Sequence, residues 1–495
     1  MTLRPAVASD LLIDGKLVPG SGGTFDIVNP ATEEVIGQAA DATAADMDSA
    51  IAAARNAFDN TDWSSDHALR ARCLRQLRDA LLAHADELRE LTVAEVGCPV
   101  FLTHGPQLEG PITDLGYFAD LAESYDWVQD LGEAKPMGIK NHRELRSEAV
   151  GVVGAITPWN FPHQINFAKI GPALAAGCTV VLKPAPDTPW CAALVGKVIA
   201  EETDFPPGVI NIVTSSDHGV GAQLSSDPRV DIVSFTGSTA TGRKVMAASA
   251  ESLKKVFLEL GGKSAFIVLD DADLGSACSM AAFAVVTHAG QGCAITTRLL
   301  VPRAKLADAI KATGDAMAGL AANDPTNPGT ICGPLISATQ RDRVESYIKL
   351  AVEEGGTIEV GGSRPAGKDK GFYVEPTLIS GLENSARVAQ EEIFGPVLAL
   401  IPYDDEADAI KIANDSDFGL SGSVWTADVE RGIEVSRQVR TGTITVNGFA
   451  MDWGSPFGGF KNSGVGRELG PEGLSAFLED KSINLPAGYE ATPKF

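Results

Sequence analysis

The sequence predicts an α/β protein built on parallel sheets, and three observations support this fold class. Near-continuous apolar runs alternate with segments of helical spacing between residues 150 and 259. A second alternating series runs from about residue 265 to residue 462. Apolar runs of this kind are typical of parallel strands that helices cover on both faces. The chain has 495 residues, too many for one hydrophobic core, so we expect two or three domains.

The chain before the first series mixes strands and helices. Residues 1–30 hold short alternating pieces that indicate strands and turns. Apolar residues recur at helical spacing from 43 to 95, and a second helical stretch covers 111–128. The polar, alternating segment 134–148 predicts a hairpin that projects from the body.

The first series contains five predicted strands, at 150–156, 179–182, 209–213, 230–235 and 255–259. Helices are predicted between them at 162–176, 190–202, 218–224 and 240–250. Parallel sheets bind ligands at the carboxyl ends of their strands. Functional side chains are therefore expected directly after these strands.

The second series predicts another α/β domain. Its helices are expected near 304–320, 337–354 and 405–414, and two of its strands at 397–401 and 443–446. The tail from 480 to 486 has the pattern of an edge strand.

Composition and charge exclude several classes of partner. A net charge of -25 argues against nucleic acid and anionic membranes, which need clustered Lys and Arg. No apolar run approaches the roughly 18 to 20 residues that span a bilayer, and the N-terminus lacks the apolar core of a signal peptide. Seven cysteines without a CxxC pair predict reduced thiols in a cytoplasmic protein, and with seven scattered histidines they predict no bound metal.

Cys293 lies among small, flexible residues in the segment 287–298. Gly290 and Gly292 leave space beside the sulfur, which a nucleophile needs and a buried structural cysteine does not. A free thiol is mostly protonated at neutral pH, so a nucleophile would need a base or a positive field elsewhere in the chain. On these residues alone, both interpretations of the cysteine stay open.

Two further candidates follow strands of the first series. The segment 235–242 lies at a strand-to-helix junction, where glycine and free helix amides can bind phosphate. It departs from the GxGxxG fingerprint because Thr239 replaces the second glycine, so an ordinary tight turn is the alternative. Glu259 ends another strand, where it would be a general base or simply a solvated or paired acid.

Asn160 and Lys183 follow the first two strands of the same series. The Asn160 amide is placed to donate to an oxyanion or to cap the next helix. Lys183 is placed to bind ribose hydroxyls or to be a surface lysine.

Together these residues resemble the NAD(P)-dependent aldehyde dehydrogenase superfamily, from about Val7 to Leu485. The resemblance rests on motifs in a fixed order: Pro158-Trp159-Asn160-Phe161-Pro162, Lys183-Pro184, Phe235-Thr236-Gly237-Ser238-Thr239, Glu259-Leu260-Gly261-Gly262-Lys263, Gly290-Gln291-Gly292-Cys293, Glu391-Glu392-Ile393-Phe394-Gly395-Pro396 and Pro456-Phe457-Gly458-Gly459.

The resemblance implies a covalent mechanism. Cys293 would attack the aldehyde carbon to give a thiohemiacetal, and the Asn160 side chain with the Cys293 N–H would stabilise the oxyanion. Hydride would leave to the nicotinamide, and Glu259 would activate the water that hydrolyses the resulting thioester. Lys169 and Glu468 match family positions associated with proton transfer near this base.

The resemblance also implies a dinucleotide cofactor. Lys183 and Glu392 would hold ribose hydroxyls, while Ser238 and the helix after it would meet the pyrophosphate. Phe394 would pack by the nicotinamide ribose. The expected cofactor-binding residues are Ile156, Thr157, Pro158, Trp159, Lys183, Pro186, Phe235, Gly237, Ser238, Gly261, Glu392 and Phe394.

Three departures from the family pattern are present: one in the segment 286–288, one at Pro186 and one at Ala168. His288 stands where an asparagine is frequent, and Val286-Thr287 replaces the usual aromatic pair. Pro186 stands where an acid often contacts the adenosine ribose, and Ala168 replaces a frequent tryptophan. The first and third departures bear on substrate shape. The change at Pro186 bears on the cofactor, so we expect NAD to be preferred, with NADP as a weaker alternative.

The expected substrate tunnel is mainly apolar, and no Arg or Lys is placed in it to clamp a carboxylate. Ala168 should leave room for bulk. A neutral, hydrophobic aldehyde of medium size is therefore predicted. The tunnel residues are Phe161, Gln164, Ile165, Ala168, Val286, Met451, Trp453 and Phe457.

The resemblance divides the chain into the parts of the aldehyde dehydrogenase fold. Residues 1–127 and 149–261 would form a Rossmann-like cofactor-binding domain, and 262–462 the catalytic domain. Residues 128–148 would be an oligomerisation hairpin, and 463–495 a return segment with an oligomerisation strand. Pairing of strands near 134–148 and 480–487 between subunits would give a homotetramer, built as a pair of dimers.

Two alternatives remain beside this interpretation. A CoA-acylating relative would pass the thioester to a thiol instead of water, but such enzymes generally lack a base at the position of Glu259. A non-catalytic protein could keep the fold as a structural or binding module. The presence of Cys293, Glu259 and Asn160 together argues against this second alternative.

Overall fold

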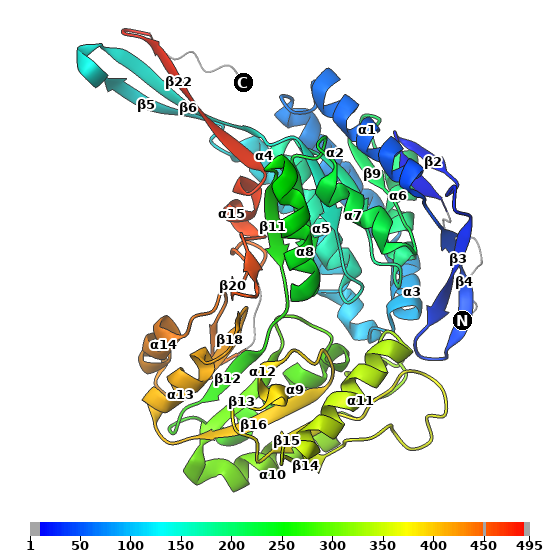
Figure 1. Cartoon of the computed structure of the whole chain (residues 1–495), viewed down its shortest axis with the longest axis vertical. Helices are drawn as coiled ribbons and strands as arrows, with labels where there is room; N and C mark the ends of the chain where they lie inside the picture. The colour runs from blue at the N-terminus through cyan, green and yellow to red at the C-terminus, as the bar shows by residue number, and fades with distance from the viewer. Residues whose placement is uncertain (1–9, 449–451, 490–495) are drawn as a thin grey trace.

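The computed structural model describes residues 10–448 and 452–489. Two α/β bodies and a projecting three-stranded arm make up the molecule (Figure 1). The predicted α/β class with parallel strands is confirmed in both bodies. None of the helices in the described parts of the chain has the length and apolar character needed to cross a membrane.

The first body is organised on an eight-stranded sheet of order β2-β1-β9-β8-β7-β10-β11-β21. Its five central strands are parallel, and the predicted strands are all present. They are β7 (Val152–Ile156), β8 (Thr179–Lys183), β9 (Ile210–Ile212), β10 (Ile232–Thr236) and β11 (Lys255–Glu259). Antiparallel strands flank them: β1 (Leu11–Ile13), β2 (Lys16–Val18) and β21 (Gly464–Val465).

Helices cover both faces of this sheet. The predicted helices between the strands are α5 (Pro162–Ala176), α6 (Pro189–Glu202), α7 (His218–Ser226) and α8 (Thr239–Ser249). The predicted helical segments before them are α1 (Ala44–Asn60), α2 (His67–Ala83), α3 (Ala85–Val96) and α4 (Glu109–Ser124). A hairpin of β3 (Thr24–Asn29) and β4 (Glu34–Ala40) lies beside them.

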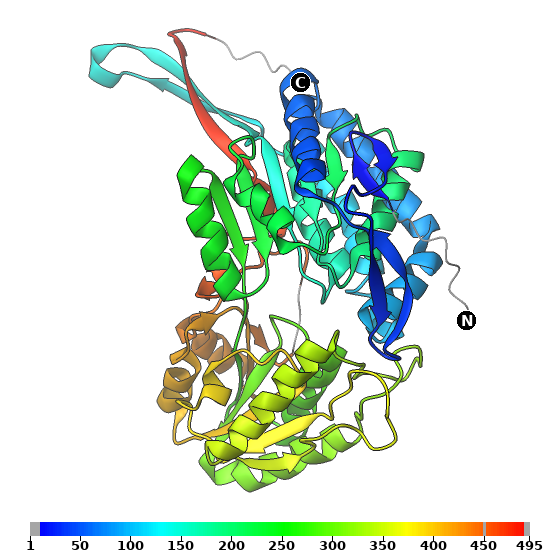
Figure 2. The ribbon, with the colours of Figure 1, turned by 45° about the vertical axis from the view of Figure 1, so that its right-hand side comes forward.

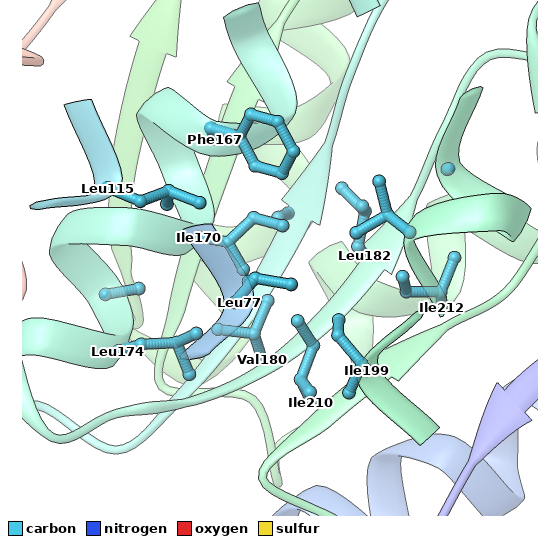
Figure 3. Close-up of a cluster of buried hydrophobic side chains, with 14 of the residues drawn as sticks. Leu77, Leu115, Phe167, Ile170, Leu174, Val180, Leu182, Ile199, Ile210 and Ile212 are labelled. Atoms are coloured by element: carbon cyan, nitrogen blue, oxygen red, sulfur yellow. The ribbon is translucent and has the colours of Figure 1, made fainter. Parts of the chain in front are cut away.

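The continuously apolar sequence of strand β8 is explained by burial on both faces of the sheet. Val180 and Leu182 point into one core cluster, which Figure 3 shows together with Phe167 and Ile170 of α5. Val181 points into the core on the other face. Successive strand side chains alternate between faces, and both faces are buried here, so each position is apolar.

The second body holds a seven-stranded sheet of order β14-β15-β16-β13-β12-β18-β19, in which only β14 is antiparallel to its neighbour. Its strands are β12 (Ser264–Val268), β13 (Thr296–Pro302), β14 (Thr357–Val360), β15 (Thr377–Ser380), β16 (Val397–Tyr403), β18 (Gly422–Trp425) and β19 (Thr445–Val446). Its helices include α9 (Leu274–Val286), α10 (Leu306–Ala318), α11 (Ala338–Glu353), α13 (Glu406–Asn414) and α14 (Val429–Gln438). The proposed domain boundary at 261/262 falls between β11 and β12.

The arm consists of β5 (Val128–Ala134), β6 (Asn141–Ala149) and β22 (Leu478–Pro486), in the order β22-β6-β5. The expected pairing of the two arm segments between subunits is corrected here, because β22 pairs with β6 of its own chain along its whole length. Nine residue pairs in one antiparallel register, from Leu478↔Ala149 to Pro486↔Asn141, make this intrachain pairing. The outer edges of β5 and β22 stay free for a partner within the described residues.

Candidate active site

Polar side chains from both bodies meet where the strands of the first sheet end. Asn160 follows β7, Lys183 ends β8, and Glu259 ends β11. Cys293 lies in the segment between α9 and β13 of the second body. Figure 2 shows the two bodies facing each other across the segments that link them. The site is therefore assembled from both parts of the chain.

The backbone before Cys293 follows an unusual path. His288, Ala289 and Gly290 have φ values of 51°, 53° and 72°, in the left-handed region that favours glycine. At Gly290 a Cβ atom would lie 2.1 Å from the Gly395 carbonyl oxygen, so no side chain fits there. The Gln291 side chain holds the loop: its Nε2 donates to the carbonyl oxygens of His288 and Pro334 at 3.1 and 3.2 Å.

Asn160 binds this loop and does not cap the helix that follows it. Helix α5 has Phe161 at its N-cap position, with no side-chain cap. The Asn160 Nδ2 donates instead to the main-chain oxygen of Gln291 at 2.9 Å. Its side chain is only 3% exposed. The amide is thus held against the segment that carries Cys293, as an oxyanion donor must be.

Glu259 is buried at the end of β11, with 1% of its surface exposed. Neither carboxyl oxygen makes a well-formed hydrogen bond. Burial and then the charge of Glu468 raise the pKa of Glu259 well above its usual range, against smaller opposing effects of Lys169 and Arg467. Because the side chain is buried, the interpretation of Glu259 as a solvated surface acid is wrong.

Lys169 and Glu468 form a buried ion pair beside Glu259. The Lys169 Nζ donates to Glu468 Oε1 at 2.6 Å and to the Ser234 hydroxyl at 3.0 Å. The Lys169 side chain is fully buried and that of Glu468 is 8% exposed. The two residues named from sequence are thus brought together, although they are far apart in the chain.

The Cys293 thiol lies in a negative environment. All seven cysteines are among the described residues, and Cys293 alone keeps solvent-exposed surface. Burial of the sulfur raises the pKa of Cys293 far above its usual range, and the carboxyls of Glu259, Glu392 and Glu468 raise it further. The positive field expected from sequence is therefore not provided by these neighbours.

The expected cofactor residues form two groups, and Glu392 belongs to the first. The Gly262 N–H donates to its Oε1 at 2.8 Å, and a Cβ atom at Gly261 would lie 2.4 Å from its Oε2. Phe394 packs edge-to-face on Trp159, with ring centroids 5.4 Å apart. The absence of a Cβ atom at Gly261 therefore allows the Glu392 carboxylate to approach the main chain closely.

Lys183 and Ser238 belong to the second group. Lys183 is buried along α7, where a Cβ atom at Gly221 would lie 3.2 Å from its Cδ. Burial lowers the pKa of Lys183 to about 8, against the charges of Asp187, Asp217 and Asp41. The interpretation of Lys183 as a surface lysine is wrong. Ser238 caps α8 by accepting a hydrogen bond from the Thr241 N–H at 3.2 Å.

Pro186 lines a cavity of about 180 Å³ together with Asp187 and Asp26. Asp187 and Pro186 therefore border the same space. Both acidic residues add negative charge beside the position expected to contact the adenosine ribose.

The expected tunnel residues differ in their exposure. Phe161, Gln164, Ile165, Trp453 and Phe457 keep partial exposure. Ala168 and Val286 are buried in the cores of the two bodies, and Met451 lies outside the described residues. Their assignment to a substrate tunnel stays a prediction. In the described parts of the chain, no group of three or more His, Cys, Asp or Glu side chains is arranged to hold a metal ion.

Sequence reasoning missed three residues that shape the site. Gln107 donates to the Asn160 carbonyl at 2.8 Å, Gln291 holds the cysteine loop, and Ser234 accepts from Lys169. Two of these residues could have been found from sequence, because Gln291 lies in a motif of the family and Ser234 lies in a predicted strand. Nothing in the sequence around Gln107 indicates its contact, because its partner lies 53 residues away.

The fold is a two-body α/β fold, and Cys293 and Glu259 act on each other electrostatically at the junction of the two bodies. A family model described as "Aldehyde dehydrogenase family" matches residues 17–483. The geranial dehydrogenase of Castellaniella defragrans is 41% identical over 470 residues, covering 95% of this chain and 97% of that protein. The 3-succinoylsemialdehyde-pyridine dehydrogenase of a Pseudomonas species is also 41% identical, over 98% of this chain and 99% of its own length.

Solved structures show the same likeness. A Mycobacterium tuberculosis aldehyde dehydrogenase complexed with NAD+ superposes with a TM-score of 0.94 at 45% identity, covering 98% of this chain and 99% of that one. A cysteine-to-alanine mutant of a Pseudomonas syringae aldehyde dehydrogenase, complexed with NAD+ and octanal, gives 0.93 at 36% identity, covering 99% of both chains. This chain belongs to the aldehyde dehydrogenase family.

Proposed function

We propose that this protein oxidises a neutral, hydrophobic aldehyde to the carboxylic acid, with NAD as the hydride acceptor. The observation that carries the proposal is the arrangement at the junction. Asn160 is bonded to the loop of Cys293, and Glu259 is buried beside them with no well-formed hydrogen bond to either carboxyl oxygen. Nucleophile, oxyanion donor and base are thus present together.

After the Cys293 thiol has lost its proton to solvent, the thiolate sulfur attacks the aldehyde carbon; a C–S bond forms, and the π electrons of the C=O bond move onto the aldehyde oxygen as negative charge. An asparagine amide has two hydrogens. One Asn160 hydrogen is used by the Gln291 carbonyl, and the other is available for the developing oxyanion, together with the Cys293 N–H. A nicotinamide held near Glu392 and Phe394 would supply the acceptor for the hydride of the thiohemiacetal carbon, and its positive charge would favour the thiolate.

Glu259 then activates the water that hydrolyses the thioester. The raised pKa of Glu259 makes the carboxylate a stronger base once it has lost its proton. The buried pair of Lys169 and Glu468 lies beside it and provides groups that can carry this proton away. Water adds to the acyl carbon, the C–S bond breaks, and the acid leaves with the Cys293 thiol restored.

The residues present fit a dinucleotide. Glu392 keeps Oε2 free for a hydroxyl, because only Oε1 is bonded to Gly262. Glycine at position 261 leaves room beside it. The N-terminus of α8 follows Ser238 and has free amides for a phosphate. The NAD+ complexes of the two structural relatives support the same cofactor here.

The proposed substrate class rests on the apolar character of the expected tunnel and on relatives that take hydrophobic aldehydes. Geranial and octanal are named for two of these relatives. Phe161, Trp453 and Phe457 are the partly exposed aromatic side chains in this set. We also propose that the free edges of the arm pair with a second copy, as the first step toward a tetramer.

A screen of aldehydes with NAD and NADP, followed by absorbance of the reduced cofactor, tests the proposal. Straight-chain and branched neutral aldehydes should react, and carboxylate-bearing aldehydes of equal length should react poorly. Absence of turnover with every neutral aldehyde would refute it. A rate that depends on added coenzyme A would instead favour the acylating alternative, against which the presence of Glu259 argues.

A further inference from the structure

Two loop segments, one from each body, exchange hydrogen bonds beside Cys293. His288, in the second body, donates from Nε2 to the main-chain oxygen of Asn160 at 2.9 Å. Asn160, in the first body, donates from Nδ2 to the main-chain oxygen of Gln291 at 2.9 Å. The Gln291 N–H donates to the His288 oxygen at 3.1 Å, which closes the ring. In each direction, a side chain of one segment donates a hydrogen bond to the main chain of the other, so the two segments hold each other in place.

The donor on the imidazole can be assigned from its surroundings. His288 is fully buried, and burial lowers the pKa of His288 to about 4, so the ring is neutral near pH 7. Its partner is a carbonyl oxygen, which only accepts, so Nε2 carries the hydrogen. The other ring nitrogen, Nδ1, is buried and has no hydrogen-bond partner in the described structure.

His288 is also screened from the expected substrate tunnel. Its ring packs edge-to-face on Phe161, with centroids 5.2 Å apart. The sequence led us to expect that this position shapes the substrate directly. With no exposed surface, His288 acts on the reaction through Phe161 or through Asn160. The hydrogen bond to Asn160 is the directional contact of the two.

We propose that His288 is a positioning residue, which holds the main chain of Asn160 so that the Asn160 amide points at the aldehyde oxygen on Cys293. This inference rests on the proposed function. Gln107 supports it from the other side, because its Nε2 donates to the same Asn160 oxygen at 2.8 Å. With its carbonyl fixed by two donors and one amide hydrogen fixed by Gln291, Asn160 keeps one hydrogen for the oxyanion.

A double-mutant cycle with His288→Ala and Asn160→Ala tests the proposal. Asn160→Ala should lower kcat/KM about 100- to 1000-fold, the usual effect of losing one oxyanion donor. His288→Ala should lower kcat about 10- to 100-fold with little change in KM, since a displaced catalytic group has an effect of this order. In the double variant, kcat/KM should be no lower than in Asn160→Ala.

His288→Gln is the matched control, because the glutamine Nε2 is as many bonds from Cβ as the histidine Nε2. It should restore kcat to within a few-fold of the wild type. Alkylation of Cys293 by iodoacetamide needs no oxyanion, so its rate should be unchanged in His288→Ala if the cysteine loop is intact. The φ of His288 is 51°, and the neighbouring Ala289 has nearly the same φ of 53°, so an alanine at position 288 is compatible with this backbone. Should His288→Ala nevertheless fail to fold, Gln107→Met removes the second donor and should show the same non-additivity.

Each outcome has a distinct meaning. If the two single effects multiply in the double variant, His288 does not act through Asn160 and the inference is overturned, while the proposed mechanism stands. If Asn160→Ala leaves kcat/KM unchanged, the oxyanion role in the proposed function fails, and the inference fails with it. A loss of activity in His288→Gln equal to that in His288→Ala would also overturn the inference.

Discussion

The Lys169 ammonium and the Glu468 carboxyl form an ion pair of 2.6 Å inside the protein, where both side chains are almost fully buried. Their charges act with opposite sign on Glu259: Glu468 raises its pKa and Lys169 lowers it. Glu468 also raises the pKa of the Cys293 thiol. The pair therefore shifts the pH range in which the base and the nucleophile lose their protons, in addition to the larger effect of burial on both groups.

Glu468→Gln and Lys169→Gln should shift the pH profile of kcat/KM in opposite directions. Activity needs deprotonated Glu259 and Cys293, so it rises with pH through their raised pKa values. Removing the negative charge of Glu468 lowers both pKa values and moves the rising limb to lower pH. Removing the positive charge of Lys169 raises the pKa of Glu259 and moves the limb to higher pH.

Steady-state rates between pH 6 and about 10 measure these shifts, with one pKa unit equal to about 1.4 kcal/mol. Each single variant leaves one buried charge unpaired, which costs on the order of 3–5 kcal/mol of stability. Thermal unfolding should therefore be recorded beside the rates. Shifts in the same direction for both variants would contradict the assignment.

Cys293→Ala should abolish aldehyde oxidation, because the sulfur forms the covalent intermediate. NAD binding should persist, since Lys183, Ser238 and Glu392 are untouched. Titration calorimetry and an activity assay on the same preparation check both statements. Full turnover by the alanine variant would contradict the assignment of Cys293 as the nucleophile.

Glu259→Gln should separate hydride transfer from hydrolysis. The amide cannot take a proton from water, so the acyl-enzyme should accumulate after a burst of reduced cofactor. Rapid mixing with absorbance detection, followed by mass measurement of the intact chain, would reveal the burst and the acyl adduct. An unchanged steady-state rate in the variant would remove Glu259 as the base.

The preference for NAD over NADP should increase in Pro186→Glu. A glutamate there would accept from the 2′-hydroxyl of NAD and repel the 2′-phosphate of NADP, an effect of about 1 to 3 kcal/mol. Asp187→Asn should act in the other direction, because Asp187 lines the same cavity as Pro186. Dissociation constants and kcat/KM for both cofactors test this. If the wild type prefers NADP, this account of the cofactor site is wrong.

Light scattering at micromolar concentration should show an oligomer. The exposed apolar side chains on the arm, Leu131 at 42% and Ile139 at 70%, offer surface that association would cover. Leu131→Asp or Ile139→Asp would place a charge on this apolar surface and should shift the mass toward the monomer. A monomeric wild type would contradict the proposed assembly.

The sequence by itself determined the elements and most of their order. Strands such as β8 are apolar at almost every position because both faces of the sheet are buried. Such a run of apolar residues can be recognised in the sequence without a structure. Predicted α5 agrees with the observed Pro162–Ala176 at both ends. The chemistry of Cys293, Glu259 and Asn160 was also named from sequence, through the resemblance of their motifs to a known family, because each position alone left alternatives open.

Only the tertiary structure decided what these side chains contact. Asn160 could have capped α5, but it donates to Gln291, 131 residues further along the chain. Strand β22 pairs with β6 of its own chain, and Ala168 and Val286 are enclosed in the two cores. The physical reason is common to all of these. Local patterns report the burial and hydrogen bonding of a segment, whereas a partner distant in sequence is selected by packing and by the charges that packing brings together.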